Sequence, residues 1–249
     1  MTNLKGKVAL ITGSGRGLGK AIAERYAQLG ADIVVNYAGS EKAAMDTVKR
    51  IEEIGARAVA IKADVSKQRE IDRLFDMALE YYGRLDIVVA NAGIELVGRS
   101  ATAFDEDDFD RLFAVNTKGA ILTMQRAARD ISDGGRIIYV GSSTTAFPMP
   151  GHALYGSSKM APRFFVEVLA KEIGVRGVTV NSILPTATEG AGVSTNGARE
   201  EVKNFISSSN PMGRMGSLDD TANAAEYLAG ELASYISGQH LLISGGAPA

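Results

Sequence analysis

Seven short, continuously apolar runs alternate along the chain with longer amphipathic segments. Strands that are buried on both faces of a parallel sheet have this pattern, because helices cover the sheet on either side. Half-exposed strands would instead alternate polar and apolar residues. We therefore predict an α/β fold in which helices flank a doubly wound, seven-stranded parallel sheet. The predicted strands cover 8–12, 32–37, 57–62, 85–91, 135–141, 178–183 and 240–244.

The amphipathic segments between these runs predict the helices. We expect one domain over 1–249, because the chain has no repeat, low-complexity tract or break in composition. The connection at about 186–216 is rich in Gly, Ser, Thr and Asn. Long connections in compact domains are often binding loops, so we expect a substrate-binding lid here, the alternative being a plain surface loop. The main predicted helices cover 18–29, 41–54, 67–82, 106–130 and a segment that runs to about Ile173.

Composition excludes several classes of function. A net charge of −2 gives the chain no general attraction to nucleic acid or to an anionic membrane. No apolar run approaches the ~18 residues of a membrane span, and the N-terminus lacks the apolar core of a signal peptide. The chain has no cysteine and only two histidines, far apart in sequence, so we expect no metal site. The absence of cysteine also fits a reducing compartment, and we expect a cytoplasmic protein.

A glycine-rich loop, T-G-S-G-R-G-L-G at 12–19, follows the first predicted strand and opens the first predicted helix. Backbone N–H groups at a helix start attract phosphate, and glycine allows the close approach. A glycine run in this context is a stronger signal for dinucleotide binding than an isolated one. Its spacing, Gly13, Gly17 and Gly19, is G-x-x-x-G-x-G and departs from the G-x-G-x-x-G of many dinucleotide-binding proteins.

Tyr155 and Lys159 lie four residues apart on a predicted helix. Residues at this spacing are neighbours on one helix face, so the ammonium group could lower the pKa of the phenol from its usual value near ~10. The phenol would then be a usable proton donor near neutral pH. For an isolated pair, the alternative is an ordinary surface tyrosine beside a surface lysine.

The glycine spacing and the Y-x-x-x-K pair together resemble the short-chain dehydrogenase/reductase family, in particular its 3-oxoacyl-ACP reductase-like members. The resemblance extends from Lys5 to Gly246 and implies a Rossmann fold. Further matches in the expected order are Asp64-Val65 after the third strand, Ala90-Asn91-Ala92-Gly93 after the fourth, Asn116 in the long helix, Ser142 after the fifth strand and Pro185 after the sixth.

The resemblance implies a catalytic tetrad of Asn116, Ser142, Tyr155 and Lys159. Tyr155 would be the acid, Lys159 would tune it and hold the nicotinamide ribose, and Ser142 would bind the substrate carbonyl. Asn116 would hold a water that links Lys159 to solvent, and the choice of Ser142 over its neighbour Ser143 rests on family spacing. The expected cofactor-binding residues are Gly13, Ser14, Arg16, Gly17, Leu18, Gly19, Asn36, Tyr37, Ser40, Asp64, Val65, Asn91, Ala92, Gly93, Tyr155, Lys159, Pro185 and Thr188.

The end of the second strand favours NADP(H) over NAD(H). Relatives specific for NAD usually carry an acidic residue there, which accepts from the adenosine ribose hydroxyls. Here that position is Tyr37, and Arg16 in the glycine loop offers a cation to a 2′-phosphate. Asn36, Tyr37 and Ser40 could donate hydrogen bonds to the same phosphate. If Arg16 instead points to solvent, we expect dual cofactor specificity.

Three features depart from the family pattern. P-T-A-T-E-G at 185–190 replaces the usual proline-glycine start of the connection after strand six, with Gly190 apparently where the family's later threonine stands. This affects the expected anchoring of the nicotinamide by Thr188. Pro162 falls inside the helix that carries Tyr155 and could kink it near the site. Ser244 replaces an acidic residue that many relatives have before the final glycines, with no consequence that we can assign.

The substrate is less constrained than the cofactor. We expect a neutral or bulky carbonyl or alcohol, because no cluster of arginine or lysine marks a site for an anionic substrate. The pocket would be framed by 143–152, by Ile94 to Val97 and by the lid. Other substrate classes remain open: a 3-oxoacyl thioester, a sugar, and a xenobiotic ketone or quinone. Two other functions also remain open: a non-catalytic nucleotide-binding regulator on the same fold, and an epimerase or dehydratase with a tightly held cofactor. Relatives of this size are usually tetramers, so we expect a homotetramer.

Overall fold

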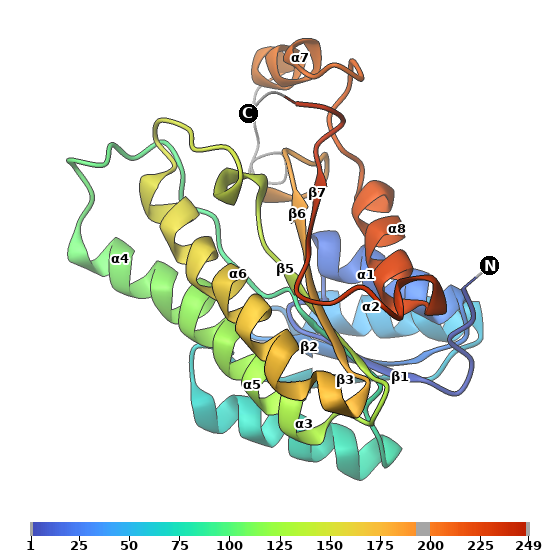
Figure 1. The fold of residues 1–249 in the computed structure, drawn as a ribbon. Coiled ribbons are helices and arrows are strands. Elements are labelled where there is room, and N and C mark those ends of the chain that lie inside the picture. The colour runs from blue at the N-terminus through green and yellow to red at the C-terminus, as the bar shows by residue number, and fades with distance from the viewer. Residues whose placement is uncertain (1, 193–199, 248–249) are drawn as a thin grey trace.

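A seven-stranded parallel sheet in the order β3-β2-β1-β4-β5-β6-β7 forms the centre of the protein (Figure 1). The computed structural model describes residues 2–192 and 200–247. Each of the seven predicted strands is present within about two residues of its predicted limits, so the predicted fold class is confirmed. The strands are β1 (Val8–Ile11), β2 (Asp32–Tyr37), β3 (Ala58–Lys62), β4 (Ile87–Ala90), β5 (Arg136–Val140), β6 (Thr179–Pro185) and β7 (His240–Ile243).

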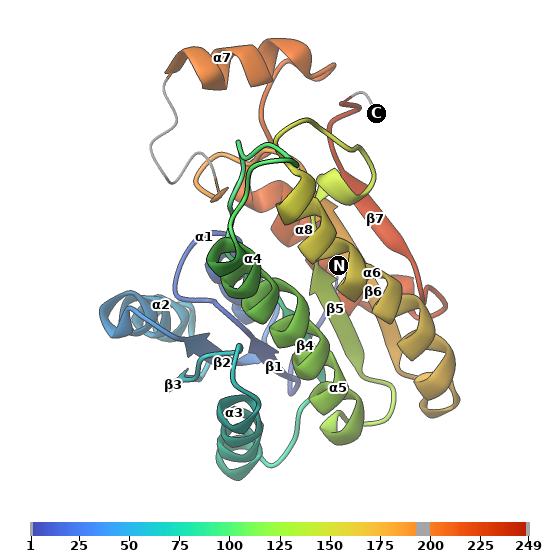
Figure 2. The ribbon, with the colours of Figure 1, turned by 90° about the vertical axis from the view of Figure 1, so that its left-hand side faces the viewer.

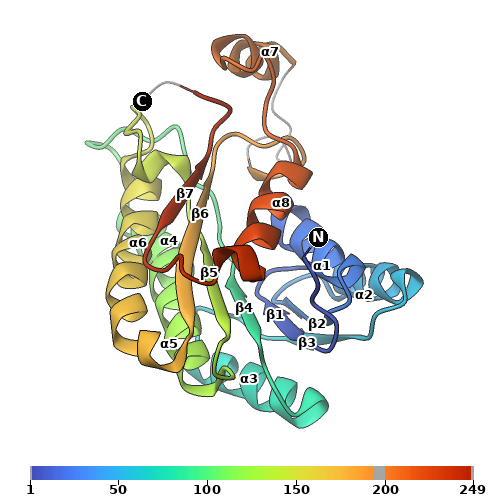
Figure 3. The same ribbon diagram turned by 45° about the vertical axis from the view of Figure 1, so that its right-hand side comes forward.

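Helices cover both faces of the sheet, as Figure 3 shows from the side. One layer contains α1 (Gly17–Gln28), α2 (Glu41–Ile54) and α8 (Leu218–Ala229). The other contains α3 (Gln68–Tyr82), α5 (Ala120–Asp130) and α6 (Ala153–Ile173). The remaining α-helices are α4 (Glu106–Phe113) and α7 (Glu200–Ser209).

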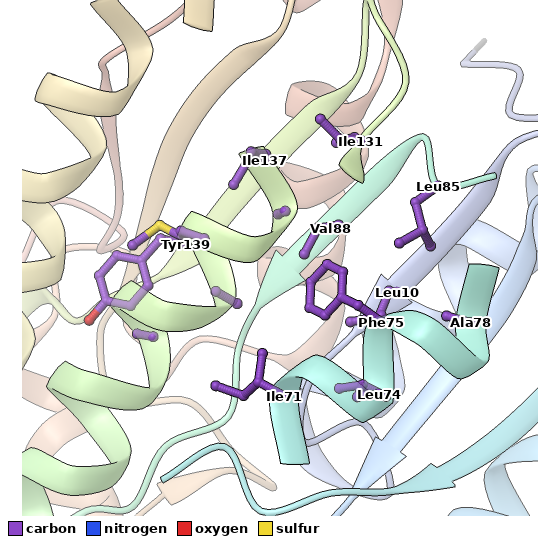
Figure 4. Packing of buried hydrophobic residues seen from close by; sticks show 14 of the residues in the cluster. Leu10, Ile71, Leu74, Phe75, Ala78, Leu85, Val88, Ile131, Ile137 and Tyr139 are labelled. Carbon is purple, nitrogen blue, oxygen red and sulfur yellow. The ribbon is translucent and has the colours of Figure 1, made fainter. Parts of the chain in front are cut away.

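Successive residues of a strand enter opposite layers of the core. Leu10 of β1 belongs to the cluster that includes α3, α5 and α6, whereas its neighbour Ile11 belongs to the cluster that includes α1, α2 and α8. In Figure 4, the side chain of Phe75 on α3 lies beside Val88 of β4. All four residues of β1 and of β4 are buried. The strands are therefore apolar throughout because both of their faces are covered.

The strand order reverses direction beside β1, and this positions the candidate site. Strands β2 and β3 follow β1 in order toward one edge of the sheet, whereas β4 lies on the other side of β1, and β5 to β7 follow it toward the opposite edge. Ligands of open α/β sheets bind at such a switch point, beyond the carboxyl ends of the strands. Helix α7 stands beyond this same edge of the sheet (Figures 1 and 2).

The helix predicted over 106–130 is continuous but changes geometry in the middle. Residues Ala114–Gly119 form a π-helix, η1, between α4 and α5. Helix α7 lies within the connection predicted over 186–216 and was not predicted. Residues 193–199 of that connection lie outside the described part of the chain. Among the residues that are described, no helix has the length and apolarity that crossing a membrane requires.

Helix α6 continues through Pro162, the residue that was expected to be able to kink it. Proline has no N–H to donate to the carbonyl four residues earlier, which here belongs to Ser158. The Thr117 hydroxyl of η1 donates to that carbonyl at 2.7 Å instead. A side chain from the neighbouring helix thus supplies the hydrogen bond that the proline removes.

Candidate active site

The glycine loop between β1 and α1 packs closely against the segment that follows β4. A Cβ at Gly19 would lie 2.5 Å from the Asn91 side-chain nitrogen and 2.7 Å from the Gly13 carbonyl. A Cβ at Gly13 would lie 3.0 Å from the Cα of Ala92. Gly13 and Gly17 also have positive φ values, 65° and 56°, which favour glycine. These positions need glycine for packing and backbone geometry, and the loop presents its N–H groups at the start of α1.

Several polar residues predicted to bind cofactor use their side chains to hold this loop. The Asn91 amide donates to the Thr12 carbonyl at 2.8 Å, and the Ser14 hydroxyl donates to the Ile11 carbonyl at 2.7 Å. Asn36 is buried, its Nδ2 donates to the carbonyls of Ile61 and Ala63, and its Oδ1 accepts from the Gly13 N–H. The expectation that the Asn36 side chain donates to a 2′-phosphate is therefore wrong: both of its donor hydrogens already have partners.

The other predicted phosphate-binding residues lie at the rim of the loop. Arg16 is exposed and immediately precedes α1. Tyr37 is half-buried at the end of β2, the strand that pairs in parallel with β1. The Ser40 hydroxyl accepts from the Ala43 N–H at 3.2 Å and caps α2, which leaves its own hydrogen able to donate.

Other residues predicted to bind the cofactor lie at the ends of β3 and β6 or just after them. Val65 is buried and packs closely on η1. A Cβ added at Gly119 of η1 would lie only 2.9 Å from the Val65 side chain and from the Val65 carbonyl oxygen. The Asp64 carboxylate accepts from both the backbone and the hydroxyl of Ser66. After β6, Pro185 is the last strand residue, and the Thr188 hydroxyl donates to the Thr186 carbonyl at 2.8 Å.

Asn116 lies buried in the π-helix, where it anchors the segment after β4. Its Oδ1 accepts from the Ile94 N–H at 2.8 Å, and its Nδ2 donates to the Ile94 carbonyl at 2.9 Å and to the Ser158 hydroxyl at 3.0 Å. A Cβ at Gly93 would come within 3.2 Å of Asn116 Oδ1 and 2.9 Å of Lys159 Nζ. The amide and the ammonium group therefore face the same side of Gly93.

Ser142 is held by its own turn. Its hydroxyl oxygen accepts from the Thr144 N–H at 3.3 Å, and the Thr144 hydroxyl lies 3.0 Å from it. The buried Ser142 stands directly after β5 and begins the short 3-10 helix η2 (Ser143–Thr145). With Thr144 donating in both contacts, the Ser142 hydroxyl hydrogen is left for a further acceptor.

Burial controls the electrostatics of Tyr155 and Lys159. Desolvation lowers the pKa of Lys159 to about 8, and the charge of Glu95 opposes this decrease. The Lys159 ammonium donates to the Val140 carbonyl at 3.2 Å. Desolvation raises the pKa of Tyr155, the charge of Glu95 raises it further, and the Ser142 hydroxyl counteracts this in part. The expected decrease in the pKa of Tyr155 is therefore wrong for the protein without ligands.

Glu95 belongs to this site and was not predicted. It follows Gly93 and Ile94, and its charge acts on both Tyr155 and Lys159. The available signal was a carboxylate inside the apolar stretch I-E-L-V at 94–97, which was expected to frame the pocket. Among the residues whose placement is described, no cluster of three or more histidine, cysteine, aspartate or glutamate side chains could hold a metal.

Comparisons with known proteins extend over nearly the whole chain. Residues 13–248 match the family described as enoyl-(acyl carrier protein) reductase. A short-chain dehydrogenase/reductase of Pestalotiopsis microspora is 40% identical, with 98% of this chain and 96% of that protein covered. A hydroxynaphthalene reductase-like protein of Metarhizium brunneum is 39% identical with the same coverage.

Solved structures have the same fold. A short-chain dehydrogenase of Burkholderia cenocepacia in complex with NADP superposes with a TM-score of 0.91 at 38% identity, covering 99% of this chain and 100% of that one. The angucycline C-6 ketoreductase LanV with bound NADP gives a TM-score of 0.92 at 35% identity, covering 99% and 97%.

Proposed function

Since the chain belongs to the short-chain dehydrogenase/reductase family, an oxidoreductase family, we propose that it is an NADP(H)-dependent reductase of bulky ring ketones. The observation that carries the proposal is the arrangement around Gly93 and Ser142. A buried lysine and a buried asparagine face one side of Gly93, and the Ser142 hydroxyl acts on the Tyr155 phenol. A hydrogen-bond donor and a proton donor are thus available to one carbonyl oxygen.

The residues present fit a nicotinamide dinucleotide. Side chains larger than hydrogen are excluded at Gly13 and Gly19 by contacts of 3.0 Å or less, so the loop can approach a pyrophosphate at the start of α1. The exposed Arg16 and the tyrosine at position 37 favour a 2′-phosphate, because no carboxylate stands at the end of β2 to repel it. Both solved relatives described above contain NADP, which supports the same preference here.

The bound cofactor would supply the hydride, and the chain's own residues would manage the charge on the carbonyl oxygen. Ser142 donates a hydrogen bond to this oxygen, and Tyr155 transfers its phenolic proton to it. The phenol of free Tyr155 is protonated at neutral pH, as in any tyrosine, and its raised pKa makes it a weaker acid. The Lys159 ammonium then stabilises the phenolate that remains, since a nearby cation favours the charged form.

Ring ketones are the substrate class that the site and the relatives favour together. The segments expected to frame the pocket carry Ile94, Leu96, Val97, Phe147 and Met149, which would contact an apolar ring. The similar proteins include a hydroxynaphthalene reductase-like protein and an angucycline ketoreductase. A 3-oxoacyl thioester is the second candidate, favoured by the family description over residues 13–248.

We also propose that the enzyme is a homotetramer. Met160, Phe164 and Val168 recur every four residues along α6 and are all exposed. Residues at this spacing form one stripe on a helix. An exposed apolar stripe of this kind is typical of a surface that another subunit covers.

The decisive experiment follows NADPH oxidation at 340 nm with a panel of tetralones, naphthoquinones, aliphatic ketones and 3-oxoacyl thioesters. We expect reduction of the ring ketones with NADPH and a loss of at least ~100-fold in kcat for Tyr155→Phe, in line with the contribution of a general acid. Arg16→Ala should raise the KM for NADPH by about ten- to hundredfold and change that for NADH little.

Each result bears on a separate part of the proposal. A higher kcat/KM with NADH would contradict the role of Arg16. Full activity of Tyr155→Phe would contradict the mechanism. Tight binding of NADPH with no turnover of any substrate in the panel would favour the non-catalytic regulator.

A further inference from the structure

The carboxylate of Glu95 is the one part of the described site whose chemistry the proposed reaction does not use. Its Oε2 is buried and has no hydrogen-bond partner among the described residues. A buried polar atom without a partner costs free energy, so such atoms are uncommon and are often functional. The mechanism proposed above needs no carboxylate at this point.

One packing contact and several electrostatic effects describe the surroundings of the Glu95 carboxylate. A Cβ at Gly192 would lie 2.8 Å from Glu95 Oε2 and 3.5 Å from Oε1, so the carboxylate packs on the backbone of the connection after β6. The charge of Glu95 acts to raise the pKa of both Tyr155 and Lys159, and the charge of His152 acts on Glu95 in turn. The carboxylate thus packs on the connection that we expect to cover the substrate and acts electrostatically on the catalytic residues of α6.

A purely structural role does not account for this arrangement. The Asp220 carboxylate, by contrast, has short-range partners: it accepts from the Ser217 N–H at 2.7 Å and pairs with Arg214. Glu95 Oε2 has neither kind of partner among residues 2–192 and 200–247. Burial raises the pKa of Glu95, with His152 and Lys159 opposing the increase. A ligand that donates a hydrogen bond to Oε2 would remove the cost of leaving it unpaired.

We propose that Glu95 is a specificity residue that binds a hydroxyl group on the substrate, at a position away from the reacting carbonyl. This inference rests on the proposed function and narrows it to hydroxylated ring ketones. A neutral hydroxyl is favoured over an ammonium group because the Lys159 cation already faces Glu95. A substrate carboxylate is disfavoured, because it would place a second negative charge against Glu95.

The test compares ring ketones that differ only in the donor. The kcat/KM of the unmodified enzyme is measured for hydroxytetralones and for the methoxytetralones substituted at the same ring positions. We expect at least one hydroxytetralone to be preferred by about ten- to hundredfold, the range for a hydrogen bond to a charged group. Glu95→Leu is similar in size but cannot accept a hydrogen bond, so the ratio of kcat/KM between the hydroxytetralone and its methoxy counterpart should fall close to one. Glu95→Gln keeps an acceptor, so part of the preference for the hydroxytetralone should remain.

A matched control is Glu80→Gln, which changes an exposed carboxylate on α3 and should leave the ratio unchanged. Thermal unfolding and quenching of protein fluorescence by NADPH check that each variant is folded. Equal kcat/KM for every hydroxy and methoxy pair in the unmodified enzyme would overturn the inference, and so would a preference that persists in Glu95→Leu.

Binding separates a failure of this inference from a failure of the proposed function. Titration of 1-naphthol and of 1-methoxynaphthalene into the NADP⁺-saturated protein needs no turnover. If no tetralone is reduced but naphthol binds more tightly than its methyl ether, and only when Glu95 is present, the inference stands and the proposed reaction is wrong. If naphthol and its ether bind equally, Glu95 is not a hydroxyl-binding residue.

Discussion

At the scale of single residues, the site depends on how each polar atom is partnered. Ser142 has two contacts with Thr144 and is left with a hydrogen to donate. Asn116 uses both ends of its amide on the Ile94 backbone. Glu95 Oε2 has no hydrogen-bond partner within the part of the chain that the structure describes. The first two residues are fixed before substrate arrives, which lowers the entropy cost of reaching a reactive geometry, whereas the third is completed only by a ligand.

The buried Lys159 predicts a basic limit to activity. Because the pKa of Lys159 in the free protein is lowered to about 8, the ammonium loses its proton as the pH rises through this value. We expect kcat/KM for NADPH, which reports on the free enzyme, to fall above pH 8, approaching tenfold per pH unit. In Lys159→Arg the cation persists, so the decline should move to higher pH even if kcat is lower. A decline at the same pH in both proteins would assign it to another group.

The lowered pKa of Lys159 also determines how this residue's contribution to the free energy of unfolding changes with pH. The pKa of an unfolded lysine is near 10.5, so between about pH 8 and 10.5 the unfolded chain binds more protons at this position than the folded chain. The contribution of Lys159 to the free energy of unfolding therefore rises with pH across that range. Burial of the charged form destabilises the fold below pH 8.

At the scale of elements, helices η1 and α6 hold the catalytic side chains by bonding to each other. Asn116 donates to the Ser158 hydroxyl, and Thr117 donates to the Ser158 carbonyl. The second bond replaces the one that Pro162 cannot make. A π-helix places two consecutive side chains of η1 against one residue of α6, and such segments occur frequently at functional sites.

This exchange of donors predicts a coupling between Thr117 and Pro162. Thr117→Val leaves the Ser158 carbonyl without its donor, at a cost of about 1–3 kcal/mol, so Tm should fall by roughly 2–10 °C in a protein of this size. In a Pro162→Ala background, the restored backbone N–H of residue 162 can donate to the Ser158 carbonyl. Thr117→Val should then lower the free energy of unfolding by at least about 1 kcal/mol less than it does in the presence of Pro162. Chemical denaturation of the four proteins measures this coupling. An equal cost in both backgrounds would show that Pro162 and Thr117 act independently.

The sequence predicts elements well where the signal is local. The runs 32–37 and 41–54 have the same limits as β2 and α2, because a buried strand and a glycine-ended amphipathic helix are each visible in a short window. The segment A-V-N-T-K-G of η1 keeps the apolar spacing of an α-helix, so its π geometry could not be predicted. Helix α7 was missed because the polar composition around it is typical of a loop.

The same distinction holds in the site. The glycine loop and the Tyr155–Lys159 pair are recognisable from their spacings when both are taken together. The inward-facing Asn36 and the buried Glu95 carboxylate depend on groups 23 or more residues away in sequence, such as the Gly13 N–H and the Gly192 backbone. These contacts exist only in the folded chain, so sequence patterns do not contain them.

At the scale of the whole molecule, the outer face of α4 and α6 differs from an ordinary solvated surface. Phe164 is 65% exposed in the middle of the stripe that Met160 and Val168 complete. On α4, Phe109 stacks on Phe113 with ring centroids 4.2 Å apart. Figure 2 shows α4 and α5 end to end in one long helix, with α6 beside it on this face of the protein. A second subunit that covers the face would bury this surface.

A charge within this face should therefore weaken assembly. We expect Phe164→Glu to raise the dissociation constant of the tetramer by at least about thirtyfold, as for a residue at an interface hot spot, with dimers as the product. Light scattering across a concentration series measures the mass. Val175→Glu is the matched control, since Val175 is an exposed apolar residue outside the stripe. A monomer in the unmodified protein, or an unchanged mass for Phe164→Glu, would contradict this assembly.

The packing of the first long helix against the last has a consequence for synthesis. Tyr26 on α1 is fully buried, and its hydroxyl donates to the Ala225 carbonyl of α8 at 2.9 Å. On a ribosome, about 200 residues must follow Tyr26 before its partner emerges, which takes roughly 10–40 s at ordinary rates of elongation. Throughout that time the growing chain carries an apolar helix face with nothing to cover it. Chaperones that shield such faces therefore have their longest opportunity to bind at the start of this chain.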